Sequence, residues 1–166
     1  MTTTLLPPRQ STPARPEAPK SLYGKVKLAE DKISAILQRF SPHLLRGALA
    51  LVFIWFGALK VLDVTPVGDL VANTIPFLDR AWFVPALGLF EVGLGAALLV
   101  GRHLVALSAV MAAHLCGTFL VLVTQPQIAF QDGNPLLLTT EGEFVVKNVV
   151  LIAAALVVAS RFHRKP

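Results

Sequence analysis

The segment from Trp82 to Val100 is apolar throughout except for one ionisable residue, Glu91. A run of this length and composition can cross the hydrocarbon core of a bilayer as a single helix. A carboxylate near the centre of a bilayer is energetically costly, so it needs an ionic partner, a polar cavity or a bound proton. The sequence therefore predicts a membrane helix with Glu91 near its midpoint, and other residues that compensate for its charge.

Three further apolar segments have the length of membrane spans. They cover residues 44–62, 104–123 and 144–160. Apolar residues make up 54% of the chain and charged residues only 15%, which departs from the composition of soluble domains. We therefore predict an all-α membrane protein in which residues 44–160 form a bundle of four transmembrane helices, the second of them at 82–100.

The chain before the first span divides into two predicted parts. Residues 1–20 contain five prolines among polar and basic residues, a composition typical of a disordered tail. In residues 21–40, apolar residues recur at helical spacing and basic residues lie between them. This pattern predicts an amphipathic helix on the cytoplasmic membrane surface, and it also suits a helix that packs on a soluble partner. Ser41 and Pro42 fit the N-cap and first position of the next helix.

The segments between the spans are more polar. Residues 63–80 predict a short helix or loop at the outer surface, interrupted near Pro76, and residues 101–103 predict a tight turn between antiparallel spans. Residues 124–142 form a long polar connection, of a kind that is commonly functional or mobile. Thr140 and Glu143 then have the spacing of a capping box for the fourth span.

Basic residues are distributed unevenly over this arrangement. Twelve of the fifteen Lys and Arg residues lie before the uncharged part of the first span, in the turn after the second span, or after the fourth span. These segments share one side of the bundle, and basic residues favour the cytoplasmic side. We therefore predict a multi-pass protein of the cell membrane (plasma or inner), with both termini in the cytoplasm and residues 161–166 as a basic tail. Nucleic-acid binding is not indicated, because no aromatic or groove-reading motif accompanies the basic residues.

Four residues are candidates for an intramembrane polar site: Lys60, Glu91, His114 and Lys147. Counting about 1.5 Å per residue along each helix places Glu91 and His114 near the midplane and both lysines in the outer half. Glu91 either forms a structural ion pair with one of the lysines or accepts protons beside a ligand. His114 either bonds a neighbouring helix or contacts a ligand. Lys147 can also pair with Glu143 on its own helix.

Small residues follow two faces of the second span. Gly88 and Gly95 lie on the face of the buried carboxylate, where they leave room for a neighbouring backbone, a side chain or a small ligand. Gly93, Ala97 and Gly101 recur at a spacing of four, which predicts a separate stripe of close helix contact.

Few cofactor sites fit the composition. The single cysteine, Cys116, excludes an intramolecular disulfide, a CxxC redox pair and a metal cluster built from several cysteines. Only His114 lies deep within a span, so one chain lacks the two ligands of a bis-histidine haem. The sequence shows no metal site, no catalytic serine constellation and no evident cofactor, and it leaves open whether the protein is an enzyme.

Four short motifs punctuate the apolar sequence: Phe56-Gly57-x-x-Lys60, Gly88-x-x-Glu91, Gly101-Arg102 and Glu141-Gly142-x-x-x-x-Lys147-Asn148. Together they resemble the DoxX family over residues 44–160, and the basic N-terminus lies outside the resemblance. The resemblance implies an integral four-helix membrane protein. Some members of that family are small subunits of thiosulfate:quinone oxidoreductases, and others belong to membrane redox or oxidative-stress systems. It therefore makes a quinone a candidate ligand, although no residue pattern here indicates thiosulfate chemistry.

Three functional hypotheses follow. The first is a membrane subunit of a redox system, in which Glu91 and His114 bond a quinone or exchange protons with it. Lys60 and Lys147 would stabilise negative charge there, and a redox-protein partner would supply electrons. The second is a non-enzymatic scaffold that recruits partners through residues 21–40. The third is a transporter of small solutes or protons, which with four spans per chain would require a homo-oligomer.

Overall fold

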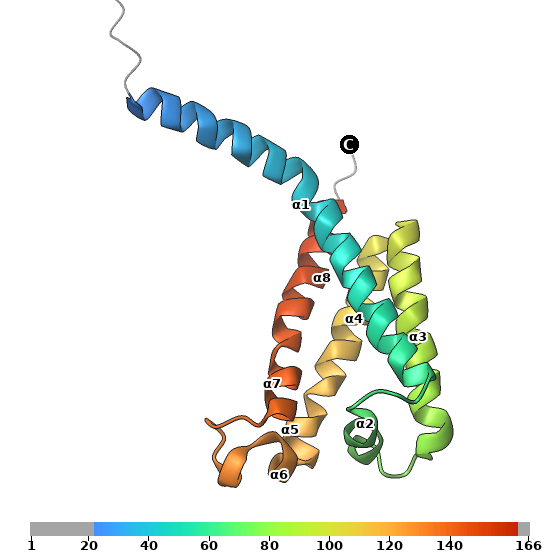
Figure 1. The fold of residues 1–166 in the computed structure, drawn as a ribbon. Helices are drawn as coiled ribbons and strands as arrows, with labels where there is room; N and C mark the ends of the chain where they lie inside the picture. The colour runs from blue at the N-terminus through green and yellow to red at the C-terminus, as the bar shows by residue number, and fades with distance from the viewer. Residues whose placement is uncertain (1–21, 163–166) are drawn as a thin grey trace, which may run out of the picture. The chain divides into compact units, whose positions relative to one another are not determined.

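The computed structural model describes residues 22–162, so the predicted tail at residues 1–20 and the last four residues of the predicted basic tail lie outside the described part. Within the described part, the chain is largely helical and contains no β-strand. Four helical segments are long and apolar enough to cross a membrane (Figure 1). The prediction of an all-α chain with four potential membrane spans is therefore confirmed.

The first long helix, α1, runs without interruption from Leu22 to Val61. The predicted start of a separate helix at Ser41 and Pro42 is wrong, because Pro42 lies inside α1. A proline removes one helical hydrogen bond, and the helix-forming residues on both sides continue the helix through it. The segment predicted as a separate amphipathic helix is therefore the N-terminal part of α1, where nearly every described side chain is exposed.

The unit that contains the bundle begins at Gln38, within α1. Its second span is one helix, whereas the third and fourth spans are each divided by a single residue, Phe119 and Lys147. The predicted second span lies within one helix, and the predicted third and fourth spans each extend over two consecutive helices. Their bounds are α3 (Arg80–Val100), α4 (Leu104–Thr118), α5 (Leu120–Thr124), α7 (Thr140–Val146) and α8 (Asn148–Phe162).

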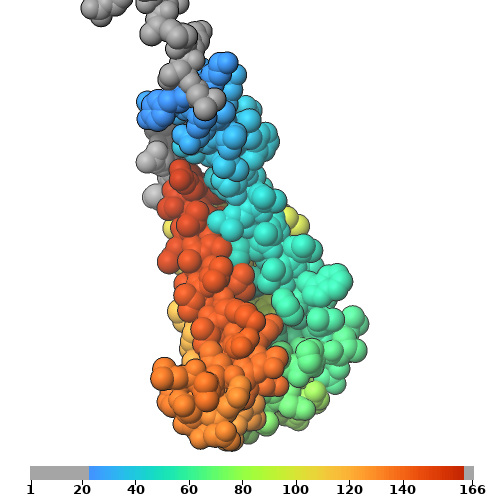
Figure 2. Space-filling model, turned by 60° about the vertical axis from the view of Figure 1, so that its left-hand side comes forward, coloured from blue at the N-terminus to red at the C-terminus, as the bar shows by residue number. Residues whose placement is uncertain are grey.

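The core of the bundle consists of apolar side chains from α1, α3, α4 and α8. Helices α4 and α8 pack against each other extensively, and the Arg46 guanidinium of α1 stacks on the Phe162 ring of α8 at 5.4 Å. Figure 2 shows α1 and the α7–α8 span forming one face of the bundle. Large apolar residues such as Trp55, Leu89 and Val149 are exposed on the outside of the bundle, as expected of a surface that contacts lipid.

Helices α1 and α3 are in contact through glycines. A Cβ atom at Gly88 would lie 2.5 Å from the carbonyl oxygen of Gly57, and a Cβ atom at Gly95 would lie 2.8 Å from that of Ala50. The space that the sequence predicted beside the carboxylate is therefore filled by a neighbouring backbone. A Cβ atom at Gly93 would meet no heavy atom within 4 Å in the described part of the chain, so the predicted close contact at Gly93 is not formed there.

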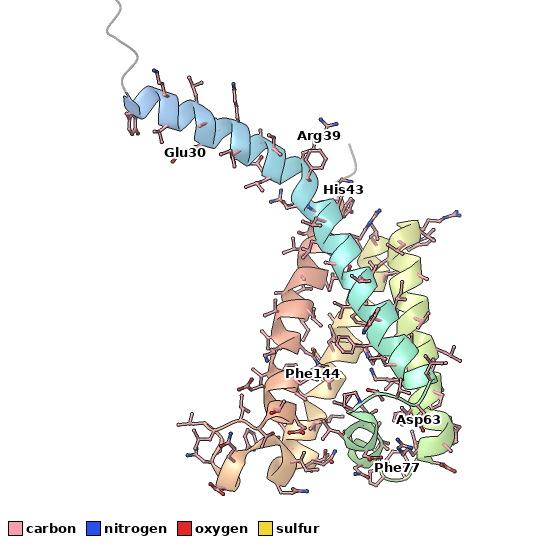
Figure 3. The ribbon with its side chains drawn as sticks, in the orientation of Figure 1. Glu30, Arg39, His43, Asp63, Phe77 and Phe144 are labelled. Carbon is pink, nitrogen blue, oxygen red and sulfur yellow. The ribbon has the colours of Figure 1, made fainter. Side chains whose placement is uncertain are left out.

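Between the first two spans lies a short helix, α2 (Gly68–Thr74), and Pro76 follows it, as predicted. Asp63 and Phe77 belong to the segments on either side of α2 (Figure 3). Arg80, the first residue of α3, forms ion pairs with Asp63 at 3.1 Å and with Asp69 at 2.8 Å. These exposed pairs connect the segment that carries α2 to the start of α3.

The long connection between the third and fourth spans is folded onto itself. It contains α6 (Pro126–Ala129) and a 3-10 turn, η1 (Gln131–Gly133). The backbone N–H of Thr139 donates to the carbonyl of Ala129 at 3.0 Å. The Thr139 hydroxyl accepts from the N–H of Gly142 at 3.1 Å. Thr139 is therefore the N-cap of α7, and the predicted capping box from Thr140 is wrong by one residue.

Candidate functional site

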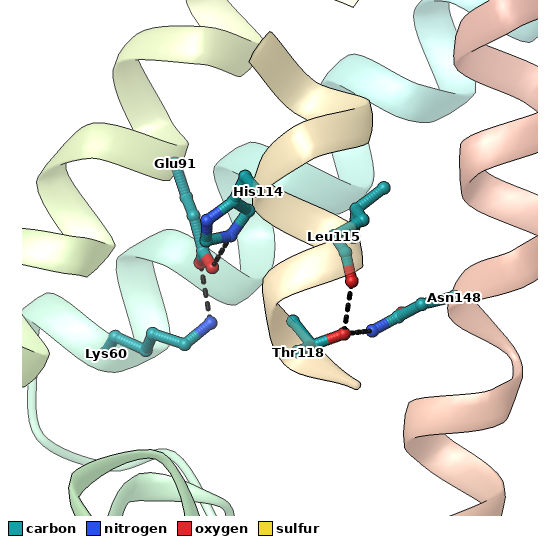
Figure 4. Close-up of polar contacts among 6 residues, drawn as sticks. All are labelled: Lys60, Glu91, His114, Leu115, Thr118 and Asn148. Carbon is teal, nitrogen blue, oxygen red and sulfur yellow. Dashed lines mark hydrogen bonds and ion pairs between the residues drawn. The ribbon is translucent and has the colours of Figure 1, made fainter. Parts of the chain in front are cut away.

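Three helices bring three ionisable side chains together inside the bundle (Figure 4). The Lys60 ammonium of α1 donates from Nζ to Oε2 of Glu91 on α3 at 2.6 Å. His114 Nε2 of α4 lies 2.9 Å from Oε1 of the same carboxylate. Lys60 and Glu91 are each 7% exposed. Each carboxylate oxygen of Glu91 therefore has its own nitrogen partner in a buried setting, which meets the need of an intramembrane carboxylate.

The glycine contact between α1 and α3 positions this cluster. Gly88 lies about one helical turn before Glu91, and a Cβ atom there would lie 2.8 Å from Cβ of Lys60. Because Gly88 has no side chain, the Lys60 side chain can pass close to α3 and reach the carboxylate. The Gly88-x-x-Glu91 and Gly57-x-x-Lys60 spacings thus act together, since each glycine lies one turn from a member of the ion pair.

The donor and acceptor roles within the cluster follow from chemistry. An ammonium only donates hydrogen bonds, and an ionised carboxylate only accepts them. With Glu91 ionised opposite Lys60, His114 must carry a hydrogen on Nε2 and donate it to Oε1. The imidazole is flanked by two rings, Phe53 at 6.1 Å and Phe90 at 5.6 Å between centroids. These contacts hold the ring plane, so the orientation of the Nε2–H group is fixed by packing as well as by the hydrogen bond.

A cavity of about 600 Å³ lies beside the cluster. All four spans and α2 contribute to its lining, which is mostly apolar. This volume lies within the range of small-molecule binding sites, and such sites combine apolar walls with a few placed polar groups. The polar side chains in this lining belong to seven residues: Lys60, Thr74, Glu91, His114, Thr118, Lys147 and Asn148.

The Lys60 ammonium keeps unused hydrogen-bonding capacity. It carries three N–H donors, and Glu91 is its hydrogen-bond acceptor within residues 22–162. Two of the three donors are therefore available to an acceptor in the cavity. A buried donor without a partner is unfavourable, so this end of the cavity favours a ligand that presents an oxygen acceptor.

A second polar pair joins the third and fourth spans. Asn148 Nδ2 donates to Oγ1 of Thr118 at 2.8 Å, and the Thr118 hydroxyl donates to the carbonyl of Leu115 at 2.6 Å. Neither Thr118 nor Asn148 was among the four candidate residues. Asn148 is the last residue of the motif Glu141-Gly142-x-x-x-x-Lys147-Asn148. The charge of Lys147 was the stronger signal for an intramembrane site, so Asn148 was not singled out.

Lys147 does not join the cluster. It borders the cavity, but its ammonium lies 3.3 Å from Oε2 of Glu143, one turn earlier on the same span, and its side chain is 72% exposed. Of the two lysines that could compensate Glu91, the structure therefore pairs Lys60 with it. The i,i+4 pair that the sequence allowed for Lys147 is the one that forms.

Within residues 22–162, no group of three or more His, Cys, Asp or Glu side chains is arranged to hold a metal ion. The site is thus described by an ion pair, an imidazole and an apolar cavity. The chain matches no protein-family model, no curated protein and no solved structure, so its resemblance to the DoxX family stays a prediction.

Proposed function

We propose that this protein binds a quinone ring in the cavity beside Lys60 and serves as a small membrane subunit of a redox system. One observation carries the proposal. A buried ammonium, paired with Glu91 at 2.6 Å, keeps two donors next to a largely apolar cavity of about 600 Å³. Quinones are membrane-soluble rings whose carbonyl oxygens accept hydrogen bonds, so they match both properties of the cavity.

The cluster also has the groups that quinone reduction requires. Reduction to a quinol adds two electrons and two protons, and each carbonyl becomes a hydroxyl group. The Lys60 ammonium would stabilise the negative charge that develops on one oxygen. Glu91 and His114 form a hydrogen-bonded pair through which a proton can pass. A partner redox protein would supply the electrons, and the DoxX-like motifs of the chain favour such a partner.

A purely structural ion pair is the competing interpretation. Such a pair would attach α1 to α3 and would need no ligand. Two features favour the proposal over this interpretation. The ion pair lies at the wall of a cavity rather than within close packing, and Lys60 has donors that the described residues leave unused.

A second role concerns the N-terminal part of α1. Apolar side chains such as Val26 and Ile33 are exposed there. The basic residues Lys25, Lys32 and Arg39 recur every seven residues, which aligns them along one edge of that apolar face. We propose that this segment lies on the cytoplasmic surface of the cell membrane, where basic and apolar groups together bind anionic lipid. The competing interpretation is that this segment recruits a partner protein, which deletion of residues 21–40 followed by co-purification would test.

The quinone proposal is tested by extraction. The protein is purified from its native membrane in nanodiscs, and bound quinone is extracted with organic solvent and quantified by mass spectrometry. We expect quinone with the wild type and at least tenfold less with the double variant Lys60→Met/Glu91→Gln, which removes both charges together. Glu143→Gln removes an exposed carboxylate and should match the wild type. Absence of quinone from the wild type, or equal amounts in all three proteins, would contradict the proposal.

A further inference from the structure

Two of the four spans are interrupted at the wall of the cavity by a local departure from α-helical hydrogen bonding, although Phe119 and Lys147 both keep right-handed helical dihedral angles. Helix α4 ends at Thr118 and α5 begins at Leu120, while α7 ends at Val146 and α8 begins at Asn148. At the first interruption the N–H of Phe119 donates to the carbonyl of Cys116 at 3.2 Å, as in a tighter 3-10 turn.

The Thr118 side chain compensates for this interruption. In a regular α-helix the carbonyl of Leu115 would accept the N–H of Phe119. That N–H is directed to Cys116 instead, and the Thr118 hydroxyl donates to Leu115. The only hydrogen of the Thr118 hydroxyl is therefore committed to the backbone, and its oxygen faces Asn148 as an acceptor.

This commitment fixes the orientation of the Asn148 amide. An amide oxygen facing Thr118 would place two acceptors together without a hydrogen between them. Nδ2 must therefore face Thr118, at 2.8 Å. Oδ1 and the second N–H of Asn148 are left for other partners. Asn148 is 8% exposed and lines the cavity, and Figure 4 shows it approaching from α8 while Lys60 approaches from α1.

We infer that Asn148, held by Thr118, is a second ligand-binding residue of the cavity, and that the cavity takes a ring with oxygen atoms at two opposite positions. Lys60 donates to one oxygen. The Asn148 amide serves the other in either redox state, because its N–H donates to a carbonyl and its Oδ1 accepts from a hydroxyl. This inference rests on the proposed quinone function and adds the class of ring, a para-quinone and its quinol.

Two ligands that differ by one group test the inference. Tetramethyl-para-benzoquinol carries two opposite hydroxyls, and pentamethylphenol replaces one of them with a methyl group. Binding of each to the full-length protein in nanodiscs is measured by calorimetry without oxygen. We expect the wild type to prefer the quinol by about tenfold, the value of one buried hydrogen bond together with the twofold statistical advantage of two hydroxyls.

Three variants separate the contributions. Asn148→Leu, which has a similar branched shape but no polar side-chain atom, should reduce the preference to about twofold by weakening the quinol and leaving phenol binding unchanged. Thr118→Val leaves the Asn148 amide in place but removes the hydroxyl that orients it. This variant should reduce the preference from about tenfold to about threefold, and it tests the inference if Asn148→Leu does not fold. Asn134→Leu, which changes an exposed asparagine outside the cavity, should retain the wild-type preference.

The outcomes distinguish the two proposals. A wild type that binds neither ring overturns the quinone function. A wild type that binds both rings equally overturns only the second contact. The second contact is also overturned if Asn148→Leu and Thr118→Val keep the full preference for the quinol. It is overturned as well if both variants weaken the two ligands alike, because Asn148 would then act on the bundle and not on the ligand.

Discussion

Lys60 and Glu91 are 31 positions apart in the chain, and the Nζ atom of one lies 2.6 Å from Oε2 of the other. The contact depends on α1 and α3 approaching through Gly57 and Gly88, whose backbones touch. Both charged groups are almost fully buried, so each is stable in that position chiefly because the other is present.

Removing one member of this pair should cost more than removing both. We expect Lys60→Met to lower the free energy of unfolding by about 3–5 kcal/mol, because Glu91 is then a buried charge without its ammonium. Lys60→Met/Glu91→Gln should lose considerably less. Unfolding in mixed micelles, followed by circular dichroism, measures both. Lys147→Met is the control and should change stability by no more than about 0.5 kcal/mol, since its pair with Glu143 is exposed. A double variant that loses as much stability as Lys60→Met, or more, would show that the unpaired Glu91 charge is not the source of the loss.

The contact between α1 and α3 gives a second prediction. Gly88→Ala would place a methyl group 2.5 Å from the carbonyl oxygen of Gly57, which forces the two backbones apart. We expect a loss of about 1–3 kcal/mol, together with loss of bound quinone because Lys60 is carried away from Glu91. Gly93→Ala is the matched control on the same helix. Its new methyl group meets no atom within 4 Å in the described part of the chain, so it should leave stability unchanged or slightly improved. Similar losses at both positions would rule out the glycine contact as the cause.

Gln125 attaches α2 to the bundle. Its Nε2 donates to the carbonyl of Leu70 at 2.9 Å and to the hydroxyl of Thr74 at 3.0 Å. Leu70 and Thr74 both line the cavity. Gln125→Leu removes these two bonds, so we expect amide hydrogens of α2 to exchange about tenfold faster, as judged by hydrogen–deuterium exchange and mass spectrometry.

The control for this change is Gln131→Leu. Gln131 donates to the carbonyl of Leu138 within the connection that precedes α7. It should accelerate exchange in that connection and leave α2 unaffected. If α2 exchanges at the wild-type rate in Gln125→Leu, packing of its apolar residues is what holds it.

The spans could be predicted from the sequence because each needs only a long apolar run, which is a local property. The partner of Glu91 could not, because both lysines have suitable depth and the choice between them depends on how the helices are rotated and ordered. Thr139 displaced Thr140 as the cap of α7 because the preceding loop bonds to Ala129. Asn148 was missed since an uncharged amide gives little signal until its neighbour across the helix interface is known.

The orientation in the membrane, inferred from the basic residues, gives a final prediction. Thiol labelling tests it in a Cys116→Ala background, since Cys116 is itself exposed. We expect a membrane-impermeant maleimide to label Leu136→Cys in intact cells or spheroplasts, because Leu136 is 90% exposed in the connection predicted to lie outside. His103→Cys, in the exposed turn between α3 and α4, should be labelled only after lysis. The reverse pattern would place the twelve basic residues outside, and would also place Lys60 in the cytoplasmic half of the bundle.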